Sequence, residues 1–191
     1  PGARPISATR GPVRTKSAGP AGPRIGGGMI SALLNPFIES VHTLCSTMLK
    51  CEVQRGRPAV SSEFAPTEDI TALIGLSGPA RGTVALSFPA PTAHAMVGRL
   101  LQIDTTDVEE NVVDGVAELV NIVAGSAKAK LHDLKTPEVI NLGLPTVIQG
   151  GRDVVHYPKA TAWLDVPFQS DLGPFHLRVT FERNAQRGEG K

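Results

Sequence analysis

The chain has 191 residues, of which 41% are hydrophobic and 4% aromatic, so we expect one domain with a mainly aliphatic core. The formal net charge is +1, but residues 1–28 carry five basic residues and no acid, which leaves 14 basic and 18 acidic residues in the remainder. A mildly acidic domain with no apolar run near the roughly 18 residues of a membrane span argues against nucleic-acid and membrane partners and favours a cytoplasmic location.

The first segment, residues 1–28, is rich in Pro, Gly, Arg and Ser and shows no hydrophobic periodicity. Such a segment cannot bury enough apolar surface to offset the entropy lost on ordering. We therefore predict a disordered basic tail over 1–28, a folded domain over 29–183 and a flexible C-terminal tail over 184–191.

The folded part is predicted to open with a helix. Apolar residues over 30–50 recur at the spacing of a buried helix face, and Asn35-Pro36 is a candidate start because Asn caps helices and Pro suits the first turn. Cys45 and Cys51 near its end form no C-x-x-C pair and have no accompanying His cluster. We interpret them as small hydrophobic residues in a reducing compartment.

The segment 51–61 is a candidate strand, and further alternating segments follow it. Residues 70–77 and 82–88 are rich in β-formers and flank a Gly-Pro turn, which predicts a hairpin. Helices are predicted over 90–102 and from about 107 to 132, and strands over 144–149, 161–166 and 175–182. This order indicates an α+β fold of a single domain, in which an antiparallel sheet packs with long helices. Its edge strand must be covered or paired, and pairing across a dimer is one solution.

The long helix carries an unusual polar stripe. At roughly 100° per residue, Asp114, Glu118, Asn121 and Gly125 fall within about 60° of one another. The apolar residues gather on the opposite side: Val112, Val116, Leu119, Val120, Val123 and Ala127. A Glu can hold a cation and an Asn can orient a water from one rigid platform, although a solvated helix face can have the same composition.

Four stretches together are similar to the CheX branch of the CheC/CheX/FliY family of chemotaxis phosphatases, and they span about 29–183. They are the helix opening at Asn35-Pro36-Phe37, the hairpin Gly75-x-x-Gly78-x-x-x-Gly82 with its strand, the helix signature Asp114-x-x-x-Glu118-x-x-Asn121-x-x-x-Gly125, and the strand entry Leu144-Pro145-Thr146-Val147-Ile148-x-Gly150. CheC-like members carry a second E-x-x-N on the first helix. Here that place reads Glu39-x-x-His42, so the chain resembles a protein with one site.

The resemblance implies a homodimer that removes phosphate from the aspartyl phosphate of a CheY-like receiver domain. Glu118 and Asn121 would be the catalytic pair, with Glu118 pairing with the receiver Lys and Asn121 holding the attacking water. Asp114 and Gly125 would support the interface. The chain would need no metal or cofactor of its own, because the receiver supplies Mg²⁺.

An alternative function is a docking or dimerisation module of the same family that binds a receiver or flagellar-switch partner without hydrolysis. Other chemistries find no support in the sequence. The five histidines show no paired ligand spacing for zinc, and the glycine pairs and triplet lack a nucleotide-binding context.

Overall fold

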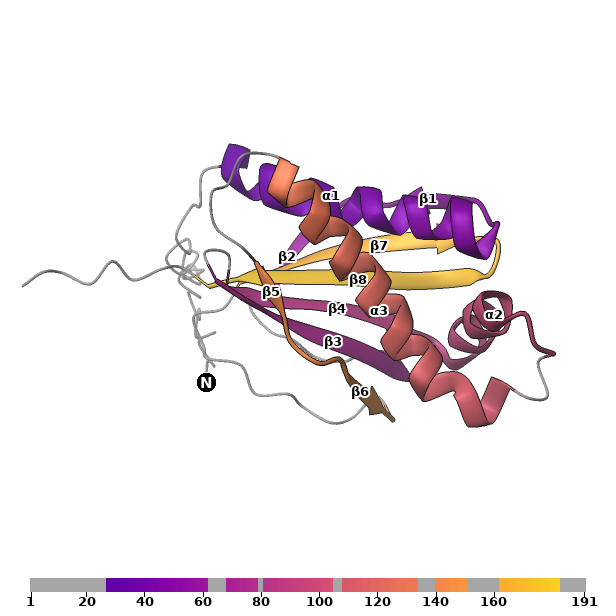
Figure 1. The fold of residues 1–191 in the computed structure, drawn as a ribbon. Coiled ribbons are helices and arrows are strands. Elements are labelled where there is room, and N and C mark those ends of the chain that lie inside the picture. Colours follow the sequence, from indigo (N-terminus) through magenta and orange to yellow (C-terminus); the bar gives the residue numbers. More distant parts are fainter. Residues whose placement is uncertain are drawn as a thin grey trace, which may run out of the picture.

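In the computed structural model, an antiparallel sheet carries helices on one of its faces (Figure 1). The structure describes residues 27–61, 68–78, 81–104, 108–133, 140–150 and 162–182. The predicted α+β class is confirmed. Within these ranges, no helix is both long and apolar enough to cross a bilayer.

The helices are α1 (Gly27–Leu44), α2 (Ala90–Leu101) and α3 (Val108–Asp133), and a π-helical turn, η1 (Cys45–Leu49), follows α1 directly. The strands are β1 (Val53–Arg55), β2 (Ala59–Ser61), β3 (Ile70–Ser77), β4 (Gly82–Phe88), β5 (Asn141–Leu142), β6 (Thr146–Gln149), β7 (Trp163–Ser170) and β8 (Gly173–Phe181). Their order in the sheet is β1-β7-β8-β4-β3-β5, with β2 also paired to β7 and β6 to β3.

The core lies between the helices and one face of the sheet. In β3, Ile70, Ala72, Ile74 and Leu76 are buried on this face, and their cross-strand partners in β4 continue the same layer. This is the period of two that strands require, and the predicted hairpin over 70–77 and 82–88 is confirmed. The predicted helices over 90–102 and 107–132 are confirmed to within one residue at each end.

The predicted start of the first helix at Asn35 is wrong. Helix α1 begins at Gly27, and Pro36 lies inside it, although a proline there removes one backbone hydrogen bond. The hydroxyl of Ser40 donates to the Pro36 carbonyl at 2.7 Å. Leu34 and Phe37 are both buried in the core on either side of the proline, so packing of Leu34 upstream of the proline outweighs the local capping signal.

Four predicted strands are shifted or divided, and the one predicted over 175–182 spans Gly173–Phe181. The segment 51–61 forms two short strands, β1 and β2, because the register against β7 changes over residues 56–58, where the Gly56 N–H still donates to the Pro167 carbonyl at 2.8 Å. The strand predicted over 144–149 begins at Thr146, and the one predicted over 161–166 extends to Ser170. A turn at Asp171–Leu172 joins β7 to β8, and Gly173 takes a left-handed φ of 124° where β8 begins.

The predicted division into tails and domain stays a prediction. Residues 1–26 and 183–191 lie outside the described residues, and α1 begins two residues before the predicted start of the domain. Homodimerisation also stays a prediction. The outer positions of the sheet belong to β1 and β2 at one side and to β5 and β6 at the other.

The opposite face of the sheet carries a charged cluster on β7 and β8. The Nδ1 atom of His176 lies 2.7 Å from Oδ1 of Asp165, and the Nε atom of Arg178 lies 3.4 Å from Oδ2. Register places Asp165 directly opposite Arg178. Burial by itself would raise the pKa of the Asp165 carboxyl, but the hydrogen bond from His176 and the charge of Arg178 outweigh it and lower that pKa.

We therefore expect Asp165→Asn to reduce the free energy of unfolding by about 1–3 kcal/mol at pH 7, because it removes the carboxylate that faces two donors. A carboxyl with a lowered folded pKa stabilises the fold above its ordinary pKa near 4 and loses this contribution as the pH falls through the folded value. Urea unfolding of both proteins between pH 7 and pH 3 measures the difference. A stability difference that does not shrink over this range would contradict the assignment.

Candidate functional site

The polar stripe lies on the outward side of α3. In Figure 1, α3 crosses the helical face of the sheet diagonally, with α2 beside its N-terminal part and α1 beside its C-terminal part. Asp114, Glu118 and Asn121 are exposed, and Gly125 is partly exposed. At 1.5 Å per residue, the stripe from Asp114 to Gly125 is about 16 Å long. The structure thus brings all four predicted residues together on one surface.

The apolar side of α3 fixes this orientation. The residues predicted to face inward are buried, with exposed fractions of 0 or 1%: Val112, Val116, Leu119, Val120, Val123 and Ala127. Since a helix places these residues opposite Glu118 and Asn121, burying them turns the carboxylate and the amide toward solvent.

Helix α2 presses closely on the N-terminal half of α3. Gly115 is buried, and a methyl group added there would collide with the Val97 side chain of α2. A glycine in the middle of a helix costs about 1 kcal/mol relative to alanine. The close approach of α2 and α3 explains why a glycine is present next to Asp114 despite this cost.

Two ion pairs tie α3 to its neighbours. The Nε2 atom of His94 on α2 lies 3.1 Å from Oε2 of Glu109, and the Nζ atom of Lys130 lies 3.5 Å from Oε2 of Glu39 on α1. The carboxylates of both pairs are largely exposed to solvent, so each pair adds little stability. In each pair, a surface carboxylate contacts a basic side chain of a neighbouring helix.

Glu118 and Asn121 differ from these residues. No hydrogen bond or ion pair joins either side chain to another residue of the described ranges. Their spacing of three places them as neighbours on the helix surface, with Cβ atoms about 5–6 Å apart. A carboxylate and an amide in this arrangement can engage an ammonium group and a water molecule of a partner at the same time.

Gly125 contrasts with Gly115. A Cβ atom added at Gly125 would meet nothing within 4 Å. Packing against the described residues therefore gives no reason for a glycine at this position. Its effect on the surface is a gap in the side-chain layer, one turn beyond Asn121, where a partner backbone can approach.

The residues of α1 that correspond to Glu118 and Asn121 are Glu39 and His42, which we call the α1 stripe. Glu39 is engaged with Lys130, and His42 takes the place of the amide. The His42 ring meets the edge of Phe168 on β7, with centroids 5.9 Å apart. The structure thus gives the α1 stripe contacts within the fold that the α3 stripe lacks.

Sequence reasoning missed the contacts that hold α3 in place. Gly115 was visible as a glycine inside a predicted helix, a signal for close packing, but the sequence did not indicate Val97 as its neighbour. Lys130 and Glu39 lie 91 residues apart in the chain, and no local signal pairs them. Among the described residues, no group of three or more His, Cys, Asp or Glu side chains is arranged to hold a metal ion.

Comparison with known proteins places this chain in a family. The family model for chemotaxis phosphatase CheX matches residues 70–169. A protein of Thermotoga maritima named CheY-P phosphatase CheX is 26% identical over 123 residues, which cover 64% of this chain and 78% of that protein.

Solved structures agree with this placement. The chemotaxis protein CheX of Desulfovibrio desulfuricans superposes with a TM-score of 0.70 at 25% identity. The match covers 78% of this chain and 99% of the Desulfovibrio chain. The CheX of a CheX-CheY-BeF3-Mg²⁺ complex from Borrelia burgdorferi has the same fold, with a TM-score of 0.64 at 23% identity over 79% of this chain and 98% of its own.

The two glycines of α3 should respond oppositely to alanine. Gly115→Ala forces a methyl group into Val97, so we expect a net loss of about 1–2 kcal/mol after the gain in helix propensity. Gly125→Ala meets no neighbour and should raise the free energy of unfolding by up to about 1 kcal/mol. Chemical denaturation of both variants measures these changes, and equal effects would contradict the distinction.

Proposed function

This chain belongs to the chemotaxis phosphatase CheX family, and on that basis we propose that it removes the phosphoryl group from the aspartyl phosphate of a CheY-like receiver domain. The observation that carries the proposal is the Glu118 and Asn121 pair, which faces solvent and has no side-chain partner among the described residues. The name of the Thermotoga maritima relative and the CheX-CheY complex from Borrelia burgdorferi support the same substrate class. Such a substrate places the reaction in the cytoplasm.

The substrate brings most of the catalytic charge with it. A receiver domain holds its aspartyl phosphate next to a bound Mg²⁺ and a Lys, which together neutralise charge on the phosphoryl oxygens. Phosphoryl transfer of this type depends mainly on positioning and electrostatics. The missing element is a water molecule held in line with the bond that breaks.

Asn121 supplies that position in the proposed mechanism. Its amide holds a water opposite the aspartyl oxygen, as a Gln does in GTPases. The water oxygen attacks phosphorus, the bond from phosphorus to the receiver aspartate breaks, and inorganic phosphate leaves with the proton of the water passing to phosphate or solvent. No covalent intermediate forms on this chain.

Glu118 fixes the register of the two proteins. We assign it a charge-assisted bond to the receiver Lys. Because Glu118 and Asn121 lie on one rigid helix whose inner side is buried, docking the carboxylate also places the amide. Asp114 lies one turn before Glu118 and adds local negative charge, and Gly125 lets the receiver backbone approach α3.

We expect Asn121→Ala to reduce the rate at which the protein dephosphorylates the receiver by about 10²-fold, which is the scale on which misplacement of a reacting group reduces a rate. Binding to the phosphorylated receiver should remain. Decay of a phosphorylated CheY-type receiver in Mg²⁺, with and without each variant, measures the rate. Unchanged decay with Asn121→Ala in a folded protein would show that the role given to Asn121 is wrong.

Glu118→Ala should instead weaken binding of the phosphorylated receiver by about 10–100-fold, because a hydrogen bond to a charged partner contributes about 1.5–3 kcal/mol. Titration of the rate against protein concentration separates this loss from a loss of maximal rate. Binding of the receiver by the unmodified protein without any acceleration would identify a docking module instead of a phosphatase.

His42→Ala tests whether one stripe or two act on the receiver. The α1 stripe lacks the amide, and its carboxylate is paired with Lys130, so we expect the decay rate to stay within about twofold of the unmodified protein. The same decay assay serves, with Asn121→Ala measured beside it. A loss as large as that of Asn121→Ala would assign catalysis to α1 as well.

A further inference from the structure

The two cysteines lie next to each other, which their spacing does not predict. In a regular helix, six residues correspond to about 600°, so Cys45 and Cys51 would point in different directions. Here α1 ends in the π-helical turn η1, and Lys50 takes a left-handed conformation with φ 49° and ψ 45°. This reversal lets the backbone N–H of Cys51 donate to the carbonyl of Cys45 at 3.0 Å.

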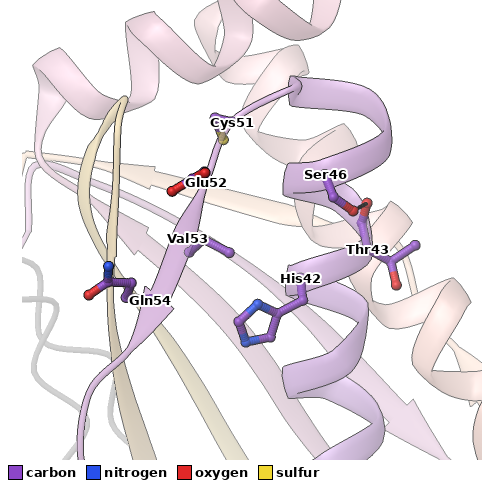
Figure 2. A pocket seen from close by; sticks show the side chains of 7 residues that line it. All are labelled: His42, Thr43, Ser46, Cys51, Glu52, Val53 and Gln54. Carbon is purple, nitrogen blue, oxygen red and sulfur yellow. Dashed lines mark hydrogen bonds between the residues drawn. The ribbon is translucent and has the colours of Figure 1, made fainter.

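The side chains also meet, in unequal environments. Both cysteines are free thiols, and the neighbouring Cys51 adds to the rise in the pKa of Cys45. Cys45 is 1% exposed in the core, whereas Cys51 is partly exposed. Cys51 lines an open pocket of about 430 Å³ between the end of α1 and β1, where Figure 2 shows it at the point at which the chain enters the strand.

The environments also separate the two thiols chemically. Burial, together with the neighbouring Cys51, raises the pKa of Cys45 to about 12. Burial raises the pKa of Cys51 too, but the hydrogen bond from Cys45 and the charge of Arg99 counter this, while Asp171 adds to it. The pKa of Cys51 is therefore raised on balance as well, with burial as the largest cause, but Cys51 is the thiol that solvent can reach.

We propose that Cys45 and Cys51 form a reversible oxidation site, in which Cys51 reacts first with a small-molecule disulfide and Cys45 then closes an intramolecular bridge. The Cys51 thiolate attacks one sulfur of glutathione disulfide, forms a mixed disulfide and releases one glutathione thiolate. Cys45 gives up its proton, attacks the Cys51 sulfur and releases the second glutathione. Two protein thiols are oxidised and one glutathione disulfide is reduced.

The surroundings of the pair suit this exchange. The pocket that exposes Cys51 is lined on one side by His42, Thr43 and Ser46 of the α1–η1 segment (Figure 2). The turn itself is held from the other side, where the Nη1 atom of Arg99 on α2 donates to the Leu49 carbonyl at 3.3 Å. The fold therefore keeps the two cysteine residues adjacent while leaving Cys51 partly exposed at an open pocket.

The test uses the full chain in glutathione buffers of increasing disulfide content, followed by acid quenching, alkylation, intact mass measurement and peptide mapping. We expect a bridge between Cys45 and Cys51, with neither residue alkylated, and full recovery of both thiols after dithiothreitol. Near-ultraviolet circular dichroism checks that the protein stays folded. A chain that stops at a mixed disulfide, stays reduced, or forms the bridge in urea but not in buffer would overturn the proposal.

Single variants test the order of the two steps. Cys45→Ser should accumulate glutathione on Cys51, because the residue that closes the bridge is missing. Cys51→Ser should stay unmodified at Cys45, because that thiol is buried. Equal glutathione adducts on both folded variants would contradict the assigned order. If the Cys45→Ser variant does not fold, Cys45→Ala takes its place. Peptide mapping of the unmodified chain shows by itself whether the bridge forms.

Discussion

The burial of one side of α3 is the interaction on which the rest of this structure depends. The valines, leucines and alanines of this side, from Val108 to Leu131, fill the space above β3 and β4 and are removed from water almost completely. Because a helix is rigid and has a fixed period, this burial sets the rotation of α3 about its own axis. The direction of Glu118 and Asn121 is a consequence of core packing, and no contact on the outer side is needed to hold it.

The surface carboxylates near α3 fall into two groups. Glu39 and Glu109 reach across to basic side chains on neighbouring helices and connect α3 to α1 and α2. Glu118 lies between Glu109 and Lys130 along α3 and makes no such contact to a described residue. A carboxylate that contacts no basic side chain in the described ranges keeps its capacity to bind a charged group on another molecule, and this distinction supports a docking role at the centre of α3.

The two glycines of α3 have opposite surroundings. At Gly115 the neighbour is Val97 of the same chain, and the missing side chain lets α2 and α3 approach closely. At Gly125 the space is open, so the missing side chain leaves room for something outside the chain. A glycine inside a helix therefore becomes informative about function once its neighbours in the fold are known.

The sequence by itself determined the features that repeat over short distances. The alternation in β3 and β4, the apolar side of α3 and the outward stripe from Asp114 to Gly125 follow from periods of 2 and 3.6 residues, and the structure confirms them. The tertiary structure decided what depends on distant segments. It buried Pro36 inside α1, brought Cys51 back to Cys45, placed Asp165 opposite Arg178 and set Val97 against Gly115. Local periodicity is written along the chain, whereas these contacts arise when separate elements share one core, and a single sequence does not specify which partners will meet.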